Sequence, residues 1–401
     1  MKVLVFNSGS SSQKSALFDL ERDSSFDPIE PLWEGELQWD GDREELHIRN
    51  RSGEEIRKEG KAGVHRASGA AMLESLWSGT TAVLKSRDEI AVVGHRIVHG
   101  GPNLTDPTRI TAEVKREIEN VSAIAPLHNQ AGLEGIELAE KLFPNVPQIA
   151  VFDTGFHRTL PDAAKIYPAP YEWFERHGIR RYGFHGINHE YCAHRAAQLL
   201  RRDLSSLKII TCHLGNGCSL CAIDGGKSID TTMGFTPLEG LMMGTRSGSI
   251  DPGILTHLLR TKNLDAAKLD TLLNHDSGLL GVSGISSDMR DVLTAAAKGN
   301  ARAQLAFDIF IHRLQSEIGA MAASLGGLDV LVFTAGIGEN SPEVRHSACA
   351  KLELLGVTLD EPANSALGPD AEISRATSRV RALIIRAQED WAIARLCPGF
   401  L

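Results

Sequence analysis

Several features that would assign a chain to a familiar class are missing from this sequence. No apolar run is as long as a membrane span, and the chain opens on a strand pattern at Lys2 instead of a signal peptide. Positive charge is in deficit, with 42 Lys and Arg against 51 Asp and Glu, so a partner with a phosphate backbone is not expected. We therefore expect a cytoplasmic protein that binds neither membranes nor nucleic acids.

Common nucleotide and metal motifs are also missing. The sequence contains no GxxxxGK[ST] and no GxGxxG after a strand, so it is not a P-loop enzyme and a Rossmann dinucleotide site is unsupported. The stretch HEYCAH is one residue longer than the zinc-protease motif HExxH. His189 and His194 would lie about 140° apart around a helix, so they cannot share a face and bind one ion.

Cysteine is scarce, with six residues in the chain. Cys218 and Cys221 form a CxxC and Cys212 lies just upstream, which raises a zinc site as one interpretation. There is no second CxxC, and these cysteines fall inside or beside apolar runs, as small buried residues do. Reduced, buried thiols are the preferred interpretation.

Length and periodicity indicate two α/β domains. A chain of 401 residues is too long to fold around one compact core, so two domains are expected. Its 42% hydrophobic and 23% charged residues are typical of globular proteins. Strand patterns such as EIAVVGHRIVHGG, VPQIAVFD and DVLVFT alternate with helix patterns such as NQAGLEGIELAEKLF and NARAQLAFDIFIHRLQSEIGAMAASLGG. The strand DVLVFT is expected to end in a glycine loop. This alternation in both halves predicts mixed sheets flanked by helices.

One strand–loop–strand pattern occurs twice. VLVFNSGSSSQKSALFD near the start has a loop of small polar residues, which is either an ordinary exposed turn or a cradle for an anion. LKIITCHLGNGCSLCAIDGG repeats the pattern in the second half, with His213 for Asn7 and Gly215 for Gly9. Two copies indicate duplicated halves whose loops hold phosphate.

Polar side chains at strand ends suggest what else is bound. In GHRIVHGG, strand alternation places Arg96 and Val98 on one face, which suits an anion with a short aliphatic tail, although a surface cation is the alternative for Arg96. Arg246 lies in the glycine-flanked loop of MMGTRSGSIDPG and could neutralise a phosphoryl group together with Arg96. Asp153 and Glu389 are candidates for binding Mg²⁺, while Asp153 alone would also serve as a capping residue.

Together these stretches resemble the acetokinase family, of the acetate and sugar kinase, heat-shock chaperone and actin superfamily. The similarity covers nearly the whole chain and rests on NSGSSSQK, GHRIVHGG, APLHN, VFDTGFH, RRYGFHG, TCHLGNG, MGFTPLEGLMMGTRSG, SGLLGVSGISSDMRD and FTAGIGENS. The resemblance implies two duplicated actin-like ATPase domains of ribonuclease H-like fold, with an active site in the cleft between them. The implied domains are 1–153 plus 390–401 on the acyl-substrate side, and 154–389 for nucleotide binding and dimerisation.

The same resemblance implies a role for each matched residue. Arg96, Asp153, His185 and Arg246 would be catalytic, with His185 donating to the phosphoryl group and Arg246 stabilising the transition state. The acyl substrate would contact Asn7, Arg96, Val98, Leu127, Phe184 and Pro237, and His128 would support the phosphates. The nucleotide would contact Lys14, His213, Gly215, Asn216, Gly217, Asp288, Met289, Arg290, Gly336, Ile337, Gly338, Glu339 and Asn340. Asn7 and Glu389 would bind the metal.

The implied reaction is reversible, in-line phosphoryl transfer between ATP and acetate, giving acetyl phosphate and ADP, in a homodimer that uses Mg²⁺ or, alternatively, Mn²⁺. Propionate kinase activity is the nearest alternative, because one methylene is worth only about 1–3 kcal/mol of discrimination. A nucleotide-dependent clamp is an alternative of another class. The pairing of Arg96 with Val98 and of Phe184 with His185 favours the kinase, because a clamp needs no carboxylate pocket.

The chain departs from the family pattern at a few positions. Ile187 and Asn188 stand in FHGINH where two hydroxyl residues are usual, which puts the fine positioning of the substrate in question. Arg386 and Ala387 stand in RAQED before the retained Glu389, and Ala387 removes a hydroxyl expected to cap the following helix.

Overall fold

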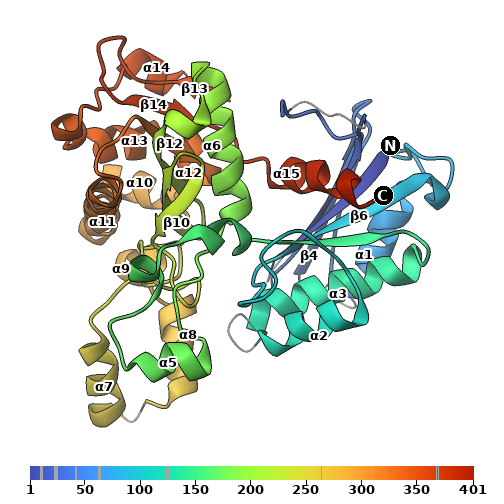
Figure 1. The fold of residues 1–401 in the computed structure, drawn as a ribbon, viewed down its shortest axis with the longest axis horizontal. Coiled ribbons are helices and arrows are strands. Elements are labelled where there is room, and N and C mark those ends of the chain that lie inside the picture. The colour runs from blue at the N-terminus through green and yellow to red at the C-terminus, as the bar shows by residue number, and fades with distance from the viewer. Residues whose placement is uncertain are drawn as a thin grey trace. The chain divides into compact units, whose positions relative to one another are not determined.

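The computed structural model describes residues 1–9, 12–21, 26–40, 43–61, 65–122, 126–262, 264–366, 368 and 370–401 (Figure 1). At positions 40, 61, 65–67 and 126–128 it describes the backbone alone. The chain forms two compact units, Met1–Phe156 with Gln388–Leu401, and His157–Ala387. The expected boundaries lay at 153/154 and 389/390. The units divide differently because helix α15 (Glu389–Leu396) runs unbroken from Glu389 and packs on the strands of the first unit.

The first unit is built on an eight-stranded sheet with the order β5-β4-β3-β2-β1-β6-β8-β7. Strand β1 pairs antiparallel with β2 and parallel with β6, so the sheet is mixed. Its strands are β1 (Lys2–Ser8), β2 (Ser12–Asp19), β3 (Trp33–Asp40), β4 (Arg43–Asn50), β5 (Glu55–Lys61), β6 (Ile90–Ile97), β7 (Thr108–Arg109) and β8 (Gln148–Phe152). Its helices besides α15 are α1 (His65–Glu74), α2 (Ala112–Asn120) and α3 (Pro126–Leu142).

Strand alternation in the first unit gives the sheet two apolar faces. On one face, Phe6, Leu17 and Trp33 form a buried cluster with Met72 of α1 and Phe143, which follows α3. The opposite face carries α15 (Figure 1). The ring of Trp391 on this helix lies 5.6 Å from the ring of Phe18. The C-terminal helix is therefore part of the first unit's core.

The second unit is built on a six-stranded sheet with the order β11-β10-β9-β12-β14-β13. Its strands are β9 (Lys208–Leu214), β10 (Cys218–Asp224), β11 (Lys227–Thr231), β12 (Val330–Thr334), β13 (Ala371–Glu372) and β14 (Arg381–Ile384). Its helices are α4 (Asp162–Lys165), α5 (Tyr171–His177), α6 (Gly186–Leu200), α7 (Pro252–Thr261), α8 (Ala266–His275), α9 (Gly278–Ser283), α10 (Met289–Ala297), α11 (Ala301–Leu325), α12 (Ala335–Asn340), α13 (Pro342–Cys349) and α14 (Glu361–Ser365).

The two sheets share a core of the same topology. The order β3-β2-β1-β6-β8 in the first matches β11-β10-β9-β12-β14 in the second, with antiparallel pairing along the hairpins and parallel pairing after them. The predicted duplication and mixed α/β class are confirmed. One local prediction was wrong: the glycine-rich segment after β12 forms the short helix α12 instead of a loop. This helix begins at Ala335, directly after the last residue of β12, and Ala335 has a φ of 65°.

All six cysteines are buried, and none forms a disulfide in the described chain. Cys218 and Cys221 lie three residues apart on strand β10, so their side chains leave opposite faces of the sheet and do not converge on one ion. Among the residues that the structure describes, no helix is long and apolar enough to cross a membrane.

We expect Gly94→Ala to weaken the packing of α15 on the first sheet. A Cβ at Gly94 would lie 2.7 Å from both Cys397 Sγ and Ile393 Cγ2, closer than packed atoms approach. Such overpacking costs about 1–3 kcal/mol, so calorimetry should show a transition about 2–10 °C lower. Gly60→Ala is the matched control, because a Cβ there meets nothing within 4 Å. Equal unfolding temperatures for the two variants would contradict this packing.

Candidate active site

Arg96 is the centre of a partly buried polar cluster in the first unit. It lies near the end of β6, and Asp153 follows the adjacent strand β8, so the two side chains meet at the same edge of the sheet. Arg96 Nη2 donates to Asp153 Oδ2 at 2.5 Å, its Nε donates to Oδ1 at 3.1 Å, and its Nη1 donates to Asn7 Oδ1 at 3.1 Å. Burial alone would lower the pKa of Arg96, but the carboxylates of Asp153 and Glu389 raise it, so the guanidinium stays charged.

Two carboxylates at the start of α15 complete the cluster. Asn7 Nδ2 donates to Glu389 Oε2 at 3.3 Å and to Asp390 Oδ1 at 2.9 Å, and Glu389 Oε2 lies 3.8 Å from Arg96 Nε. Burial and the neighbouring charge of Glu389 raise the pKa of Asp390 to about 6. The N-terminus of α15 favours both negative charges, and no side chain caps it, because the Gln388 side chain makes no capping hydrogen bond.

This cluster fits a hard divalent cation that keeps most of its coordination for phosphate and water. Within the described residues, no group of three His, Cys, Asp or Glu side chains is arranged to hold a metal by itself. Mg²⁺ requires only one or two carboxylates when phosphate oxygens and water supply the rest. Glu389 offers a carboxylate oxygen of the right kind, and Asp390 adds negative charge beside it. The amide oxygen of Asn7 is also of the right kind, and in this structure it accepts from Arg96.

The remaining predicted residues of the first unit differ in their surroundings. Val98, just after β6, is buried, as expected of a small apolar wall. Lys14 lies across from Asn7 in the β1–β2 register, and its Nζ is 3.1 Å from Glu36 Oε1. The side chains of Leu127 and His128 lie outside the described part of the chain.

His185 is the central predicted residue of the second unit. It precedes α6 in the left-handed region, with a φ of 57°, a conformation that costs a non-glycine residue about 1–3 kcal/mol. Its ring stacks on that of His213, with centroids 4.0 Å apart and an interplanar angle of 6°. The Nδ1 atom of His185 lies 2.9 Å from Ser219 Oγ.

Arg246 and His185 converge on the hairpin between β9 and β10. A Cβ placed on Gly217 would lie 3.5 Å from Arg246 Nη1 and 3.5 Å from His185 Nε2, so both groups face the same glycine. Arg246 Nη1 also donates to the carbonyl of Pro237 at 3.0 Å, which brings a predicted acyl-pocket residue to the same place. Burial lowers the pKa of Arg246 from its ordinary value. Phe184, next to His185, is buried.

A pocket of about 720 Å³ collects most of the predicted nucleotide-binding residues. It is lined by Gly215, Asn216, Asp288, Met289, Arg290, Gly336, Ile337 and Asn340, and also by Ser287, Leu293, Thr294, Ser341 and Glu343. Arg290 is held against Asp288, the N-cap of α10, by hydrogen bonds of 2.5–3.1 Å. The pocket therefore combines glycine backbone, an amide and an exposed guanidinium.

Three predicted nucleotide residues lie beside this pocket instead of lining it. Gly217 faces His185 and Arg246, and Gly338 packs against the ends of β9 and β12. Glu339 Oε1 accepts a hydrogen bond of 2.9 Å from the backbone of Ala387. Arg345 is fully buried behind them, where it donates to the carbonyls of Gly338 and Glu339 at 2.9 Å and fixes the end of α12.

Comparison with known proteins decides the family. The model of the acetokinase family matches residues 2–395. The acetate kinase of Trichormus variabilis is 57% identical over 400 residues, which cover 99% of this chain and 98% of that protein. The crystal structure of Porphyromonas gingivalis acetate kinase has 41% identity, a TM-score of 0.89 and 98% coverage of both chains. A propionate kinase from Francisella tularensis has 37% identity, a TM-score of 0.91 and full coverage of both chains.

The chain belongs to the acetokinase family. It is therefore a kinase that phosphorylates a carboxylate and uses a nucleotide as its other substrate. Acetate is the carboxylate named for the relatives of highest identity given above, and the propionate kinase has a lower sequence identity with a similar TM-score.

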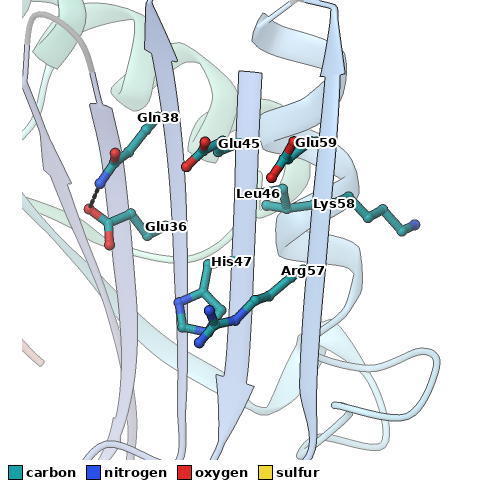
Figure 2. A pocket seen from close by; sticks show the side chains of 8 residues that line it. All are labelled: Glu36, Gln38, Glu45, Leu46, His47, Arg57, Lys58 and Glu59. Atoms are coloured by element: carbon teal, nitrogen blue, oxygen red, sulfur yellow. Dashed lines mark hydrogen bonds between the residues drawn. The ribbon is translucent and has the colours of Figure 1, made fainter. Parts of the chain in front are cut away.

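A second hollow lies on the exposed face of the β3–β4–β5 meander in this acetokinase (Figure 2). It is lined by Glu36, Gln38, Glu45, Leu46, His47, Arg57, Lys58 and Glu59. Gln38 donates to Glu36 at 2.7 Å, and His47 pairs with Glu55 across the strands. The His47–Glu55 pair joins β4 to β5, and such cross-strand pairs stabilise an antiparallel sheet with one solvated face.

Several polar residues around the two clusters were not predicted from the sequence. Asp390 stands next to the predicted Glu389, and a pair of carboxylates at a helix start is the signal that was available. Ser219, Thr211 and Arg345 carry no such signal, because hydroxyls on strands and an arginine in a helix are common. The burial of these three side chains becomes visible only once β9, β10 and α13 are in place.

We expect Gly217→Ala to reduce phosphoryl transfer without unfolding the protein. The added methyl would meet His185 and Arg246 at ordinary contact distances, so the fold tolerates it, but it would occupy the space between their nitrogens. The steady-state kcat should fall by tenfold or more, as when a donor to a developing charge is displaced, with an unchanged unfolding temperature. Gly319→Ala, where a Cβ meets nothing within 4 Å, is the control. Activity equal to that of the control would show that this space is not used.

Proposed function

We propose that this acetokinase transfers the terminal phosphoryl group of ATP to acetate, reversibly, giving acetyl phosphate and ADP in a Mg²⁺-dependent reaction. The observation that carries the proposal is the convergence of Arg246 Nη1 and His185 Nε2 on Gly217, in a unit that also contains the large glycine-lined pocket. Two donors aimed at one point of a glycine hairpin suit a group with charge spread over several oxygens.

The first unit is suited to bind the carboxylate. Acetate is already ionised at neutral pH, so its attack needs no general base. Arg96 offers a permanent charge beside the small apolar side chain of Val98, which matches a carboxylate with one methyl group. Asp153 accepts two hydrogen bonds from Arg96, so we assign it to orienting the guanidinium. Asp153 therefore contributes through Arg96 and takes no proton itself.

The second unit is suited to bind the nucleotide. The pocket around Asp288 and Arg290 would take the nucleoside, and the hairpin 215–217 would cradle the phosphates with its backbone N–H groups. Arg246 would neutralise charge that develops on the transferring group, and His185 would donate a hydrogen bond to it. In-line transfer requires the carboxylate oxygen and the terminal phosphorus to approach within bonding distance.

Glu389 would hold Mg²⁺, with Asp390 and Arg96 setting the charge around it. Asn7 would join Glu389 through its amide oxygen, which requires that the amide turn that oxygen from Arg96 toward the ion. The ion, when bound, supplies neutralisation of the nucleotide phosphates. Asn7 connects the proposed carboxylate site at Arg96 with the proposed metal site at Glu389. Its oxygen accepts from Arg96, while its nitrogen faces both carboxylates.

The substrate assignment is tested by trapping the acyl phosphate with hydroxylamine. We expect hydroxamate from acetate and MgATP, with kcat/KM falling about tenfold or more for propionate and further for butyrate, because each methylene must fit beside Val98. A higher kcat/KM for propionate would reassign the enzyme as a propionate kinase. No hydroxamate with intact nucleotide binding would favour the clamp.

We also propose that the protein is a homodimer through its second unit. Helix α7 buries none of its residues within the chain, and Ile254 and Leu259 on it are 45% and 41% exposed. Light scattering should give twice the chain mass of 43.4 kDa. Leu259→Glu should shift the mass toward the monomer, and Leu354→Glu, at a side chain 80% exposed on another segment, should not. A monomer in the unmodified protein would overturn the proposal.

A further inference from the structure

Behind His185, three buried side chains form a continuous hydrogen-bonded chain. His189 on α6 lies between two strands: its Nδ1 is 2.6 Å from Thr211 Oγ1 on β9, and its Nε2 is 2.8 Å from Ser219 Oγ on β10. Ser219 Oγ is in turn 2.9 Å from His185 Nδ1. Thr211, His189 and Ser219 have no exposed surface, so their protons must be satisfied within this chain.

Only one direction of donation along this hydrogen-bonded chain gives every hydrogen an acceptor. A serine hydroxyl has a single hydrogen, so Ser219 donates to one of its two histidines and accepts from the other. If Thr211 donates to His189 Nδ1, then His189 Nε2–H donates to Ser219, and Ser219 donates to His185 Nδ1. The hydrogen of His185 is then left on Nε2, the atom that faces Gly217 and Arg246.

The opposite direction leaves a buried donor without an acceptor. His189 would then donate to Thr211, whose own hydroxyl hydrogen would need a further partner. Among the described residues, Thr211 Oγ1 makes no side-chain hydrogen bond other than the one with His189. A buried, unsatisfied hydroxyl is unfavourable. Burial, with the nearby His157 and His213, also lowers the pKa of His189 well below its usual range, so His189 is neutral and has one hydrogen to donate.

A neighbouring contact holds the plane of the His185 ring. His213 stacks on His185, and Asn188 Nδ2 donates to His213 Nδ1 at 2.9 Å while lying 3.3 Å from Thr334 Oγ1. Asn188 is fully buried and is one of the positions where this sequence departs from the family pattern. The amide thus fixes His213, and the stacked ring restricts the tilt of His185.

We propose that Thr211, His189 and Ser219 are positioning residues that keep His185 in the neutral tautomer with its hydrogen on Nε2, where it donates to the transferring phosphoryl group. This rests on the proposed function, through the role of His185. The three residues act through His185 and make no contact with substrate of their own. The hydrogen-bonded chain sets the direction in which His185 donates, and the positive charge comes from the arginines.

The tautomer is read directly from long-range ¹H–¹⁵N spectra of the full-length enzyme labelled with ¹⁵N-histidine, with His185→Gln used to assign its signals. In the unmodified enzyme we expect Nε2 of His185 to be the protonated nitrogen. In Ser219→Ala and in Thr211→Val, which has the same shape without the hydroxyl, the signals should move toward a mixture of tautomers. Thr211→Ser keeps the hydroxyl and should retain the original signals.

Kinetics of the same variants separate positioning from stability. Ser219→Ala and Thr211→Val should lower kcat about tenfold, with KM for acetate and ATP changed less than twofold, because the substrates still bind. Ser228→Ala is the matched control. It also removes a buried hydroxyl that contacts an imidazole, because Ser228 Oγ lies 2.8 Å from His157 Nδ1. Neither Ser228 nor His157 belongs to the hydrogen-bonded chain of Thr211, His189 and Ser219. It should leave the His185 signals and kcat unchanged.

Two outcomes would overturn the proposal. One is a hydrogen on Nδ1 of His185 in the unmodified enzyme, and the other is unchanged His185 signals in both Ser219→Ala and Thr211→Val. If the spectra change as expected while no acetyl phosphate forms from acetate and MgATP, the proposed function fails and the positioning chain stands. The spectra need no turnover, so the two failures are distinguishable.

Discussion

The ion pair between the partly buried guanidinium of Arg96 and the carboxylate of Asp153 is the interaction on which the first half of the site depends. A charge removed from water must be paired, and Arg96 is paired by Asp153, with Asn7 and Glu389 close by. These four residues come from β6, the end of β8, β1 and α15, so one side chain joins segments from both ends of the chain. Removing Asp153 would take away both of its hydrogen bonds with Arg96 and leave Glu389, 3.8 Å away, as the nearest negative charge. The same contacts fix the orientation of the guanidinium, and the proposed function uses that orientation to bind the carboxylate of the substrate.

Duplication explains why a second polar site exists and why it differs. Each unit has a hairpin followed by two parallel strands, so each copy presents a loop and a set of strand ends at one edge of its sheet. In the first copy, the hairpin strand ends in Asn7, which faces carboxylates. In the second, His213 takes the corresponding place and stacks on His185. The copies keep the geometry that places polar groups at strand ends, while the chemistry of those groups has diverged: a carboxylate-rich cluster in one and an imidazole-rich cluster in the other.

Much of this could be predicted because strand ends and hairpin loops follow from local sequence. The β9–β10 hairpin, the strand that stops at Asp153 and the helix that starts at Glu389 all have short-range signals, and Gly215, Asn216 and Gly336 line one pocket as the motifs indicated. The helix at Ala335 was missed because its first residue takes a positive φ that only tertiary contacts maintain. Thr211, Ser219 and Arg345 were missed for a related reason. Their importance comes from burial, which depends on segments far away in the sequence.

The arginines and the histidine have different duties in the proposed function, and the chemistry of the substrate explains the difference. A kinase that phosphorylates a hydroxyl benefits from a base, but a carboxylate nucleophile is already charged at neutral pH. A histidine near the transferring group is then more useful as a neutral donor of fixed direction than as a proton acceptor. Arginines hold their charge at any working pH, so the proposed function assigns charge neutralisation to Arg96 and Arg246. A buried hydroxyl–imidazole chain behind His185 is what such a division requires, because it sets where a proton sits without adding a charge that the core would have to accommodate.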